Sequence, residues 1–231
     1  MKGFFEVYSK LNQKNAITPQ IYDQLLVAIN TMKMLPGQRL SETEISQKLG
    51  VSRQPVRETF IKLNQNGLVE VLPQRGTYVV KISVKLIGDA RFIREAIELA
   101  IIKKAIEVAD NSFFEKIDNL LEKQREASKV NDMEMFHKYD DAFHQCFATE
   151  IGHEHAWHIV EQQKSRLDRV RFLSLPQTDT MAHLVKQHTM IAQAVKDKNL
   201  TAAEIILKEH LSELSLVLPE IIRLHPDYFI D

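Results

Sequence analysis

The apolar positions in the first third of the chain follow a helical period and then change to a strand period. Apolar side chains recur at every fourth residue from Ile21 to Ile29, which predicts one buried helix face. Thr18 is a common N-cap residue and Pro19 suits a first helical position. We therefore expect a first helix over residues 18–32.

Two further helices follow, separated by a tight turn. The run Ser41-Glu-Thr-Glu44 has the pattern of a capping box, so it predicts the start of a short helix that Gly50 ends. Ser52 is placed to cap a third helix, whose apolar face extends from Val56 to Leu63. Two helices joined by a glycine-containing turn form a helix-turn-helix.

The pattern becomes extended after the third helix. Residues 68–72 and 77–80 are rich in β-branched side chains and are separated by the four-residue loop Pro73-Gln-Arg-Gly76. This pattern predicts a β-hairpin, so the first part of the chain is expected to be a winged helix-turn-helix over residues 10–81.

The rest of the chain shows no comparable strand pattern. Apolar periodicity predicts six helices joined by short loops, near residues 84–109, 113–129, 132–150, 153–173, 179–197 and 201–223. Short loops favour antiparallel neighbours. We therefore expect a mainly α protein, in which an all-α antiparallel bundle over residues 82–231 follows the winged domain.

The composition shows an uneven distribution of charge along the chain and also indicates the cellular compartment. The chain up to Lys81 carries 11 Lys and Arg against 6 Asp and Glu, a net +5, whereas the remainder carries 19 against 25, a net −6. A basic first part is suited to a polyanion such as DNA. The single cysteine, Cys146, fits a reducing compartment, and we find neither an export signal nor a membrane span. We expect a cytoplasmic protein.

Three polar side chains at the start of the third predicted helix lie away from its apolar face. Arg53 and Arg57 are one turn apart, and an arginine fork can pair with O6 and N7 of guanine. Gln54 lies between them, and Ser52 with the free N–H groups of the first turn suits a phosphate oxygen. At the hairpin tip, Arg75-Gly76 combines a cation with a residue that allows close backbone approach.

These residues belong to a longer pattern. The runs Leu49–Phe60, Gly67–Glu70 and Pro73–Val79 resemble the signature of GntR-type transcription regulators over about residues 16–81. The resemblance implies contacts with operator DNA from Arg53, Gln54, Arg57, Arg75 and Gly76. Gln54 stands where relatives commonly have threonine.

The second part contains a separate group of candidate metal ligands. Asp140 and His144 are four residues apart, so they share one helix face and can converge on one ion. His188 and His210 each fall within an apolar stripe and therefore point inward. A buried imidazole needs a hydrogen-bond partner or a metal. The other six histidines are expected at the surface or in structural roles, and Cys146 as a packed small hydrophobe.

This pattern resembles the FCD effector domain of the FadR-type branch of GntR regulators, over about residues 84–218. The resemblance implies that Asp140, His144, His188 and His210 hold a divalent metal ion. Zinc and nickel are the first candidates, and the donor set also suits copper, cobalt and iron. The resemblance further implies open coordination positions for a carboxylate effector. A homodimer is expected because helix-turn-helix dimers read two half-sites of DNA.

Arg94 is the candidate for binding that effector. It lies in a mostly apolar helix, so it can either face a pocket and bind a carboxylate or pair with Glu98 one turn away. The hypothesis is a DNA-binding regulator, a repressor, whose operator affinity responds to a small carboxylic acid at a metal site. The alternatives are a metal-responsive regulator without an organic effector and a metallohydrolase.

Overall fold

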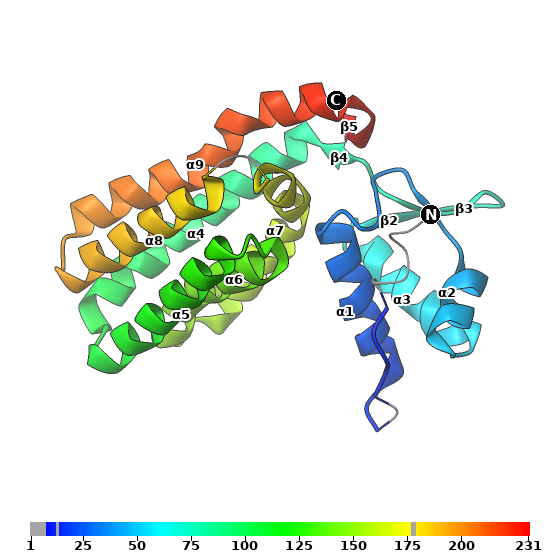
Figure 1. Ribbon diagram of the computed structural model, residues 1–231, viewed down its shortest axis with the longest axis horizontal. Coiled ribbons are helices and arrows are strands. Elements are labelled where there is room, and N and C mark those ends of the chain that lie inside the picture. Colours follow the sequence, from blue (N-terminus) through cyan, green and yellow to red (C-terminus); the bar gives the residue numbers. More distant parts are fainter. Residues whose placement is uncertain (1–7, 13, 177–178) are drawn as a thin grey trace. The chain divides into compact units, whose positions relative to one another are not determined.

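The computed structural model describes residues 8–12, 14–176 and 179–231; the first seven residues, included in the search for an export signal, lie outside it. The chain divides into two compact units. One reaches to Lys85 and includes Ile222–Asp231, and the other spans Leu86–Ile221. The second unit is helical, so the structure confirms a mainly α protein with a small N-terminal sheet (Figure 1).

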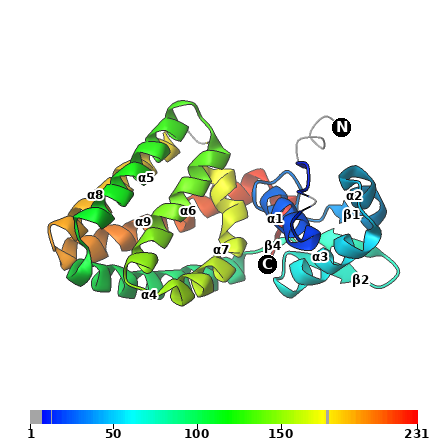
Figure 2. The ribbon, with the colours of Figure 1, turned by 90° about the horizontal axis from the view of Figure 1, so that it is seen from below.

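Three helices and a three-stranded sheet make up most of the described part of the N-terminal unit. The helices are α1 (Ile17–Asn30), α2 (Glu42–Leu49) and α3 (Arg53–Gln65), and the strands are β1 (Arg39–Leu40), β2 (Val69–Leu72) and β3 (Gly76–Val79). The strands form an antiparallel sheet in the order β1-β3-β2. Helix α3 packs against both α1 and α2, as Figure 2 shows. The expected winged helix-turn-helix is present.

The ends of these helices differ in part from the expectation. Helix α1 begins at Ile17 after an uncapped Ala16, and the hydroxyl of Thr18 donates to Glu58 instead of capping the helix. The Ser41 hydroxyl accepts from the backbone N–H of Glu44, as the capping box predicts. Ser52 holds the N-cap position of α3 but makes no side-chain cap hydrogen bond.

Two features of the sheet were not predicted. The two-residue strand β1 pairs with β3 through the couples Arg39–Tyr78 and Leu40–Thr77. The loop between β2 and β3 has three residues, Pro73–Arg75, because Gly76 already pairs with Leu72. Strand β1 could not be predicted because its two residues are too few to show a strand period.

Six helices form the second unit, and each lies within three residues of its predicted ends. They are α4 (Val84–Val108), α5 (Asn111–Lys129), α6 (Met133–Glu150), α7 (Glu154–Ser174), α8 (Thr180–Lys196) and α9 (Leu200–Leu224). Their main core joins side chains from all six helices, including Phe113, Phe143 and Trp157. In the described part of the chain, no helix has the length and apolar composition needed to cross a membrane.

The chain returns to the first unit at its C-terminal end. Strand β5 (Phe229–Ile230) pairs in parallel with β4 (Ile82–Ser83), and the Ser83 hydroxyl donates to the Asp231 carboxylate. The prediction of no strand after residue 83 is therefore wrong at β5. The short 3₁₀ helix Pro226–Tyr228 precedes this strand.

Candidate functional site

The start of α3 presents the predicted DNA-reading side chains to solvent. The Arg53 and Arg57 side chains are 59% and 54% exposed, and Gln54 is exposed and donates to Glu58. Their orientation follows from the helix, since Val56 on the opposite face is fully buried. This end of α3 is therefore accessible to a DNA groove.

An acidic residue of α2 joins the two arginines. Glu42 accepts from Arg57 Nε at 3.2 Å and Nη2 at 3.1 Å, and from Arg53 Nη2 at 3.1 Å. Hydrogen bonds from Arg57 hold the pKa of the Glu42 carboxyl below its usual range. Sequence reasoning did not find this contact, because the three residues belong to two helices whose angle the pattern does not give.

The wing carries a further exposed cation. Arg75 is exposed at the hairpin tip, and Gly76 has a φ of 111°. A Cβ on Gly76 would lie 3.0 Å from Arg39 Nε, so the Arg39 side chain packs against this glycine. A hollow of about 460 Å³ is lined by Arg39, Glu42, Arg53, Arg57 and Gly76, among others. Arg39 is a functional candidate that sequence reasoning missed.

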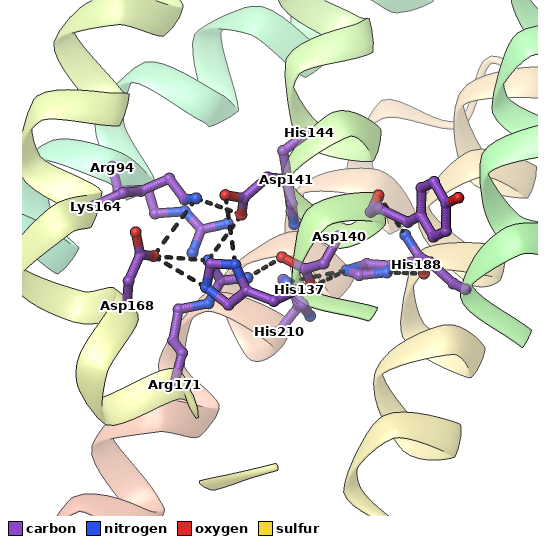
Figure 3. A network of polar contacts seen from close by, with 12 residues as sticks. Arg94, His137, Asp140, Asp141, His144, Lys164, Asp168, Arg171, His188 and His210 are labelled. Atoms are coloured by element: carbon purple, nitrogen blue, oxygen red, sulfur yellow. Dashed lines mark hydrogen bonds and ion pairs between the residues drawn. The ribbon is translucent and has the colours of Figure 1, made fainter. Parts of the chain in front are cut away.

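Three predicted metal ligands meet inside the second unit. His144 of α6, His188 of α8 and His210 of α9 are buried, and one ring nitrogen from each lies within 4.8 Å of the others. The Nε2 atoms of His188 and His210 are 3.4 Å apart. Figure 3 shows these rings converging from their helices.

Polar side chains hold the outer nitrogens of these rings. Nδ1 of His144 lies 2.7 Å from Glu98, and Nδ1 of His188 lies 2.8 Å from Gln124 Oε1. Nδ1 of His210 lies 2.8 Å from Gln187 Oε1. A carboxylate or amide oxygen can only accept, so each Nδ1 carries the proton.

The two glutamines cannot be turned to reverse this assignment. The amide nitrogen of Gln124 donates to the Tyr139 carbonyl, and that of Gln187 donates to the Glu213 carboxylate. Their oxygens must therefore face the imidazoles. All three Nε2 atoms consequently present lone pairs toward one another, which is the arrangement of a three-nitrogen metal site.

Two buried atoms at this centre lack a hydrogen-bond partner. They are Nε2 of His144 and Oδ1 of Asp140, the latter 3.6 Å from His188 Nε2. The other Asp140 oxygen accepts from Arg171. An unpaired buried polar atom costs about 1–3 kcal/mol, so the donor set fits a cation. Asp140 is 1% exposed, whereas the Asp141 side chain is 33% exposed, so Asp140 is the better placed of the two carboxylates.

The electrostatics favour neutral imidazoles. Burial lowers the pKa of His188 and His210 well below the usual histidine value, and burial also lowers the pKa of His144. Burial alone would raise the pKa of Glu98, but Arg94 and His144 hold it well below its usual range. Neutral imidazole is the form that binds a metal.

Arg94 pairs with Glu98 and also lines a cavity. Its Nε donates to Glu98, whereas its buried Nη2 has no hydrogen-bond partner. Arg94 also lines a cavity of about 80 Å³ together with Asp140 and His210. The structure therefore brings the predicted effector residue to the same cavity as two predicted ligands.

A buried network of charges adjoins this cavity and was not predicted. Lys164 and Arg171 of α7 contact the carboxylates of Asp141 and Asp168, and Arg171 also contacts Asp140 (Figure 3). His137, expected at the surface or in a structural role, is half-buried and lies 3.4 Å from Asp168. The one available signal was the spacing of residues 164, 168 and 171, which places them on one helix face.

His137, Asp141 and Asp168 form a second group with metal-ligand geometry. Their carboxylates already pair with Lys164 and Arg171, so these cations supply the charge that a metal would. Cys146 is half-buried against the main core, as expected of a packed small side chain.

Comparisons with known proteins agree with both parts. The model of the bacterial regulatory proteins of the gntR family matches residues 17–79, and the FCD domain model matches residues 89–213. The HTH-type transcriptional repressor RspR of Escherichia coli is 36% identical over 96% of this chain and 98% of its own length.

More distant proteins extend this agreement. The gluconate operon transcriptional repressor of Bacillus subtilis is 23% identical over 71% of the chain and 69% of its own length. The solved structure of E. coli McbR/YncC has the same fold, with a TM-score of 0.79 over 89% of this chain and 98% of that one, at 20% identity. The chain belongs to the GntR family of DNA-binding transcription regulators, in the group that carries an FCD domain.

Proposed function

We propose that the FCD domain binds a divalent metal ion through Nε2 of His144, His188 and His210, with Asp140 Oδ1 as a fourth ligand. The observation that carries this proposal is the pair of buried, unpartnered acceptors at the centre, Asp140 Oδ1 and His144 Nε2. Zinc or nickel suits this set of three imidazoles and one carboxylate. A bound ion would offer a Lewis-acidic position to a carboxylate.

The protein's own residues orient this centre. Glu98, Gln124 and Gln187 fix the proton of each imidazole on Nδ1, so that Nε2 stays available. Such outer partners typically matter about 10–100-fold for metal affinity. Arg171 holds the second oxygen of Asp140, so it orients the fourth ligand.

The proposed effector is a small carboxylic acid that binds in the adjoining cavity. Arg94 offers an unpartnered Nη2 there, and an arginine donor on a carboxylate is a strong, charge-assisted hydrogen bond. Effector binding would shift operator affinity by the difference between its affinities for two states of the protein. By analogy with the named repressors among its relatives, we infer that the chain acts as a repressor, as a cytoplasmic homodimer.

Metal content is tested with a pair of histidine variants. The double substitution His188→Ala with His210→Ala should remove stoichiometric zinc or nickel, measured by elemental analysis after loading and desalting. His158→Ala is the control, because His158 is 63% exposed and pairs only with Glu161 among the described contacts. Retention of one ion per chain by the double variant would refute the site.

Effector dependence is tested by operator affinity in the presence of metal. Titration with carboxylic acids should change the affinity of the wild type and not that of Arg94→Ala. If metal alone shifts operator affinity and no acid adds to it, the metal-responsive alternative is correct. A metallohydrolase role has no support, since the relatives are transcription regulators.

A further inference from the structure

The side chains that line the effector cavity change from polar to apolar within one helical turn. Asp140, Arg171 and His210 line its polar end, and four residues further along the same helices lie Phe136, Leu175 and Leu214. Four residues advance a helix by about 6 Å. On α6 the apolar residue has the lower number, and on α7 and α9 it has the higher number, as expected where α6 is antiparallel to the other two helices.

A fourth helix adds a further apolar side chain to this end. Leu184 of α8 lies four residues before His188 and lines the cavity, as do Leu211 and Val217 of α9. The cavity therefore has a polar end beside His210 and, one turn away, an end lined mainly by apolar side chains, to which Ser174, Thr180 and Glu213 also contribute.

The polar end offers few free donors. The terminal nitrogens of Arg171 contact the carboxylates of Asp140, Asp141 and Asp168, and Arg91 pairs with Glu95. Among the described arginines that line the cavity, Arg94 alone has a buried guanidinium nitrogen without a partner. One such donor beside one cation site suits a single carboxylate.

We propose that the effector is a monocarboxylate with a short apolar body, rather than a sugar acid or a dicarboxylate. This inference rests on the proposed effector function. The carboxylate lies at Arg94 and the metal position, and the body packs against Phe136, Leu184 and Leu214. A volume of about 80 Å³ admits on the order of six water-sized groups, which matches an acid of about four or five carbons once its two carboxylate oxygens are counted. Hydroxyl groups or a second carboxylate would be desolvated against leucine side chains.

The test compares three acids on zinc-loaded protein. We expect 3-methylbutanoate to bind at least tenfold more tightly than succinate or gluconate by calorimetry, and to raise the melting temperature most. Leu214→Asn should weaken binding of 3-methylbutanoate about tenfold or more. Leu216→Asn is the matched control, because Leu216 lies on the same helix and is 77% exposed.

The outcomes separate the two proposals. Tighter binding of succinate or gluconate that depends on Arg94 would overturn the apolar monocarboxylate and leave the effector function standing. Failure of every acid to bind would overturn both. Equal losses in Leu214→Asn and Leu216→Asn would refute the assignment of the apolar end.

A second inference concerns the DNA-binding surface and stands on different contacts. A guanidinium has two donating edges, one formed by Nε with one terminal nitrogen and the other by the two terminal nitrogens. Glu42 occupies the first edge of Arg57. The second edge remains available for a bidentate pair with guanine O6 and N7.

We infer that Glu42 is a positioning residue that fixes Arg57 for base reading and keeps it from pairing freely with phosphates. Its carboxylate also holds Arg53, so both arginines are oriented before DNA arrives. In the hollow it lines, the Glu42 charge opposes a phosphate that approaches without a matching base.

The experiment compares Glu42→Gln with Glu44→Gln. Glu44 lines the same hollow and carries the same charge, but it pairs with Lys48 and holds neither arginine. Affinities are measured for a duplex selected from a random pool and for its scrambled counterpart at one salt concentration. We expect Glu42→Gln to lower the ratio of the two affinities at least tenfold, and Glu44→Gln to change both affinities alike. Equal ratios in the two variants would overturn the inference.

Discussion

Gly76 has a backbone conformation that a side chain would strain in two ways. Its φ of 111° is unfavourable for L-residues, and a Cβ would lie 3.0 Å from Arg39 Nε. We expect Gly76→Ala to lower the free energy of unfolding by about 1–3 kcal/mol, measured by urea denaturation. Gly67→Ala is the control, since Gly67 has a φ of 68° with nothing within 4 Å of a built Cβ. A Gly67→Ala loss as large as that of Gly76→Ala would show that Arg39 makes no contribution.

Cys146 is expected to be an unreactive thiol. Burial raises its pKa to about 11, so about one thiol in a thousand is ionised at pH 8. Native protein should therefore react with a disulfide reagent at least tenfold more slowly than protein unfolded in guanidinium chloride. Equal rates in the two states would mean that the thiol is accessible and ionised. Cys146→Ser provides the blank.

At the scale of the elements, α2 and α3 each have a serine at the N-cap position, so the two serines can be compared. The Ser41 hydroxyl accepts from the Glu44 N–H at 3.3 Å, whereas Ser52 makes no side-chain cap hydrogen bond. Ser41→Ala should therefore cost about 1 kcal/mol of stability in thermal or urea unfolding, and Ser52→Ala less. Ser52→Ala should instead weaken operator binding if its hydroxyl contacts a phosphate. A larger stability loss at Ser52 than at Ser41 would contradict this division.

The sequence was informative about elements in proportion to their length. Helices of two or more turns repeat an apolar period several times, so α4 to α9 could be placed from pattern alone. A two-residue strand is too short to show a period. Strands β4 and β5 also pair across nearly 150 residues, so neither of these two strands has a local sequence signal. The cap of α1 was misplaced because Thr18 found a partner on α3 instead.

The same limit applies to the candidate site, where positions set by a local pattern could be predicted and positions set by helix packing could not. The inward position of His188 and His210 followed from their apolar neighbours, and both are buried. Gln124 and Gln187 were not identified, because a glutamine in a helix has no pattern that separates a histidine partner from a solvated side chain. Their role depends on how α5, α8 and α9 pack, which is a tertiary property.

At the scale of the whole molecule, the uneven charge matches the different sites that the two parts of the chain contain. The net positive part of the chain contains the winged helix-turn-helix, with Arg53, Arg57 and Arg75 exposed on it. The net negative part contains the histidine centre. Each phosphate that a protein neutralises contributes about −0.9 to the slope of log affinity against log salt. The measured slope therefore gives the number of DNA phosphates that the protein's cations neutralise.

This count also tests the number of protein copies on the operator. With two phosphate contacts from each copy, at Arg53 and Arg75, the slope is expected to be about −2 for one copy and about −4 for two. Arg75→Gln should make the slope shallower by about 1 per copy, because the wing would lose one phosphate contact. Lys129→Gln removes the same charge from an exposed position on α5 and should leave the slope unchanged. A slope near −4 that Arg75→Gln reduces by about 2 would require two wings on one operator, as in a homodimer. A flat response would refute phosphate neutralisation by this surface.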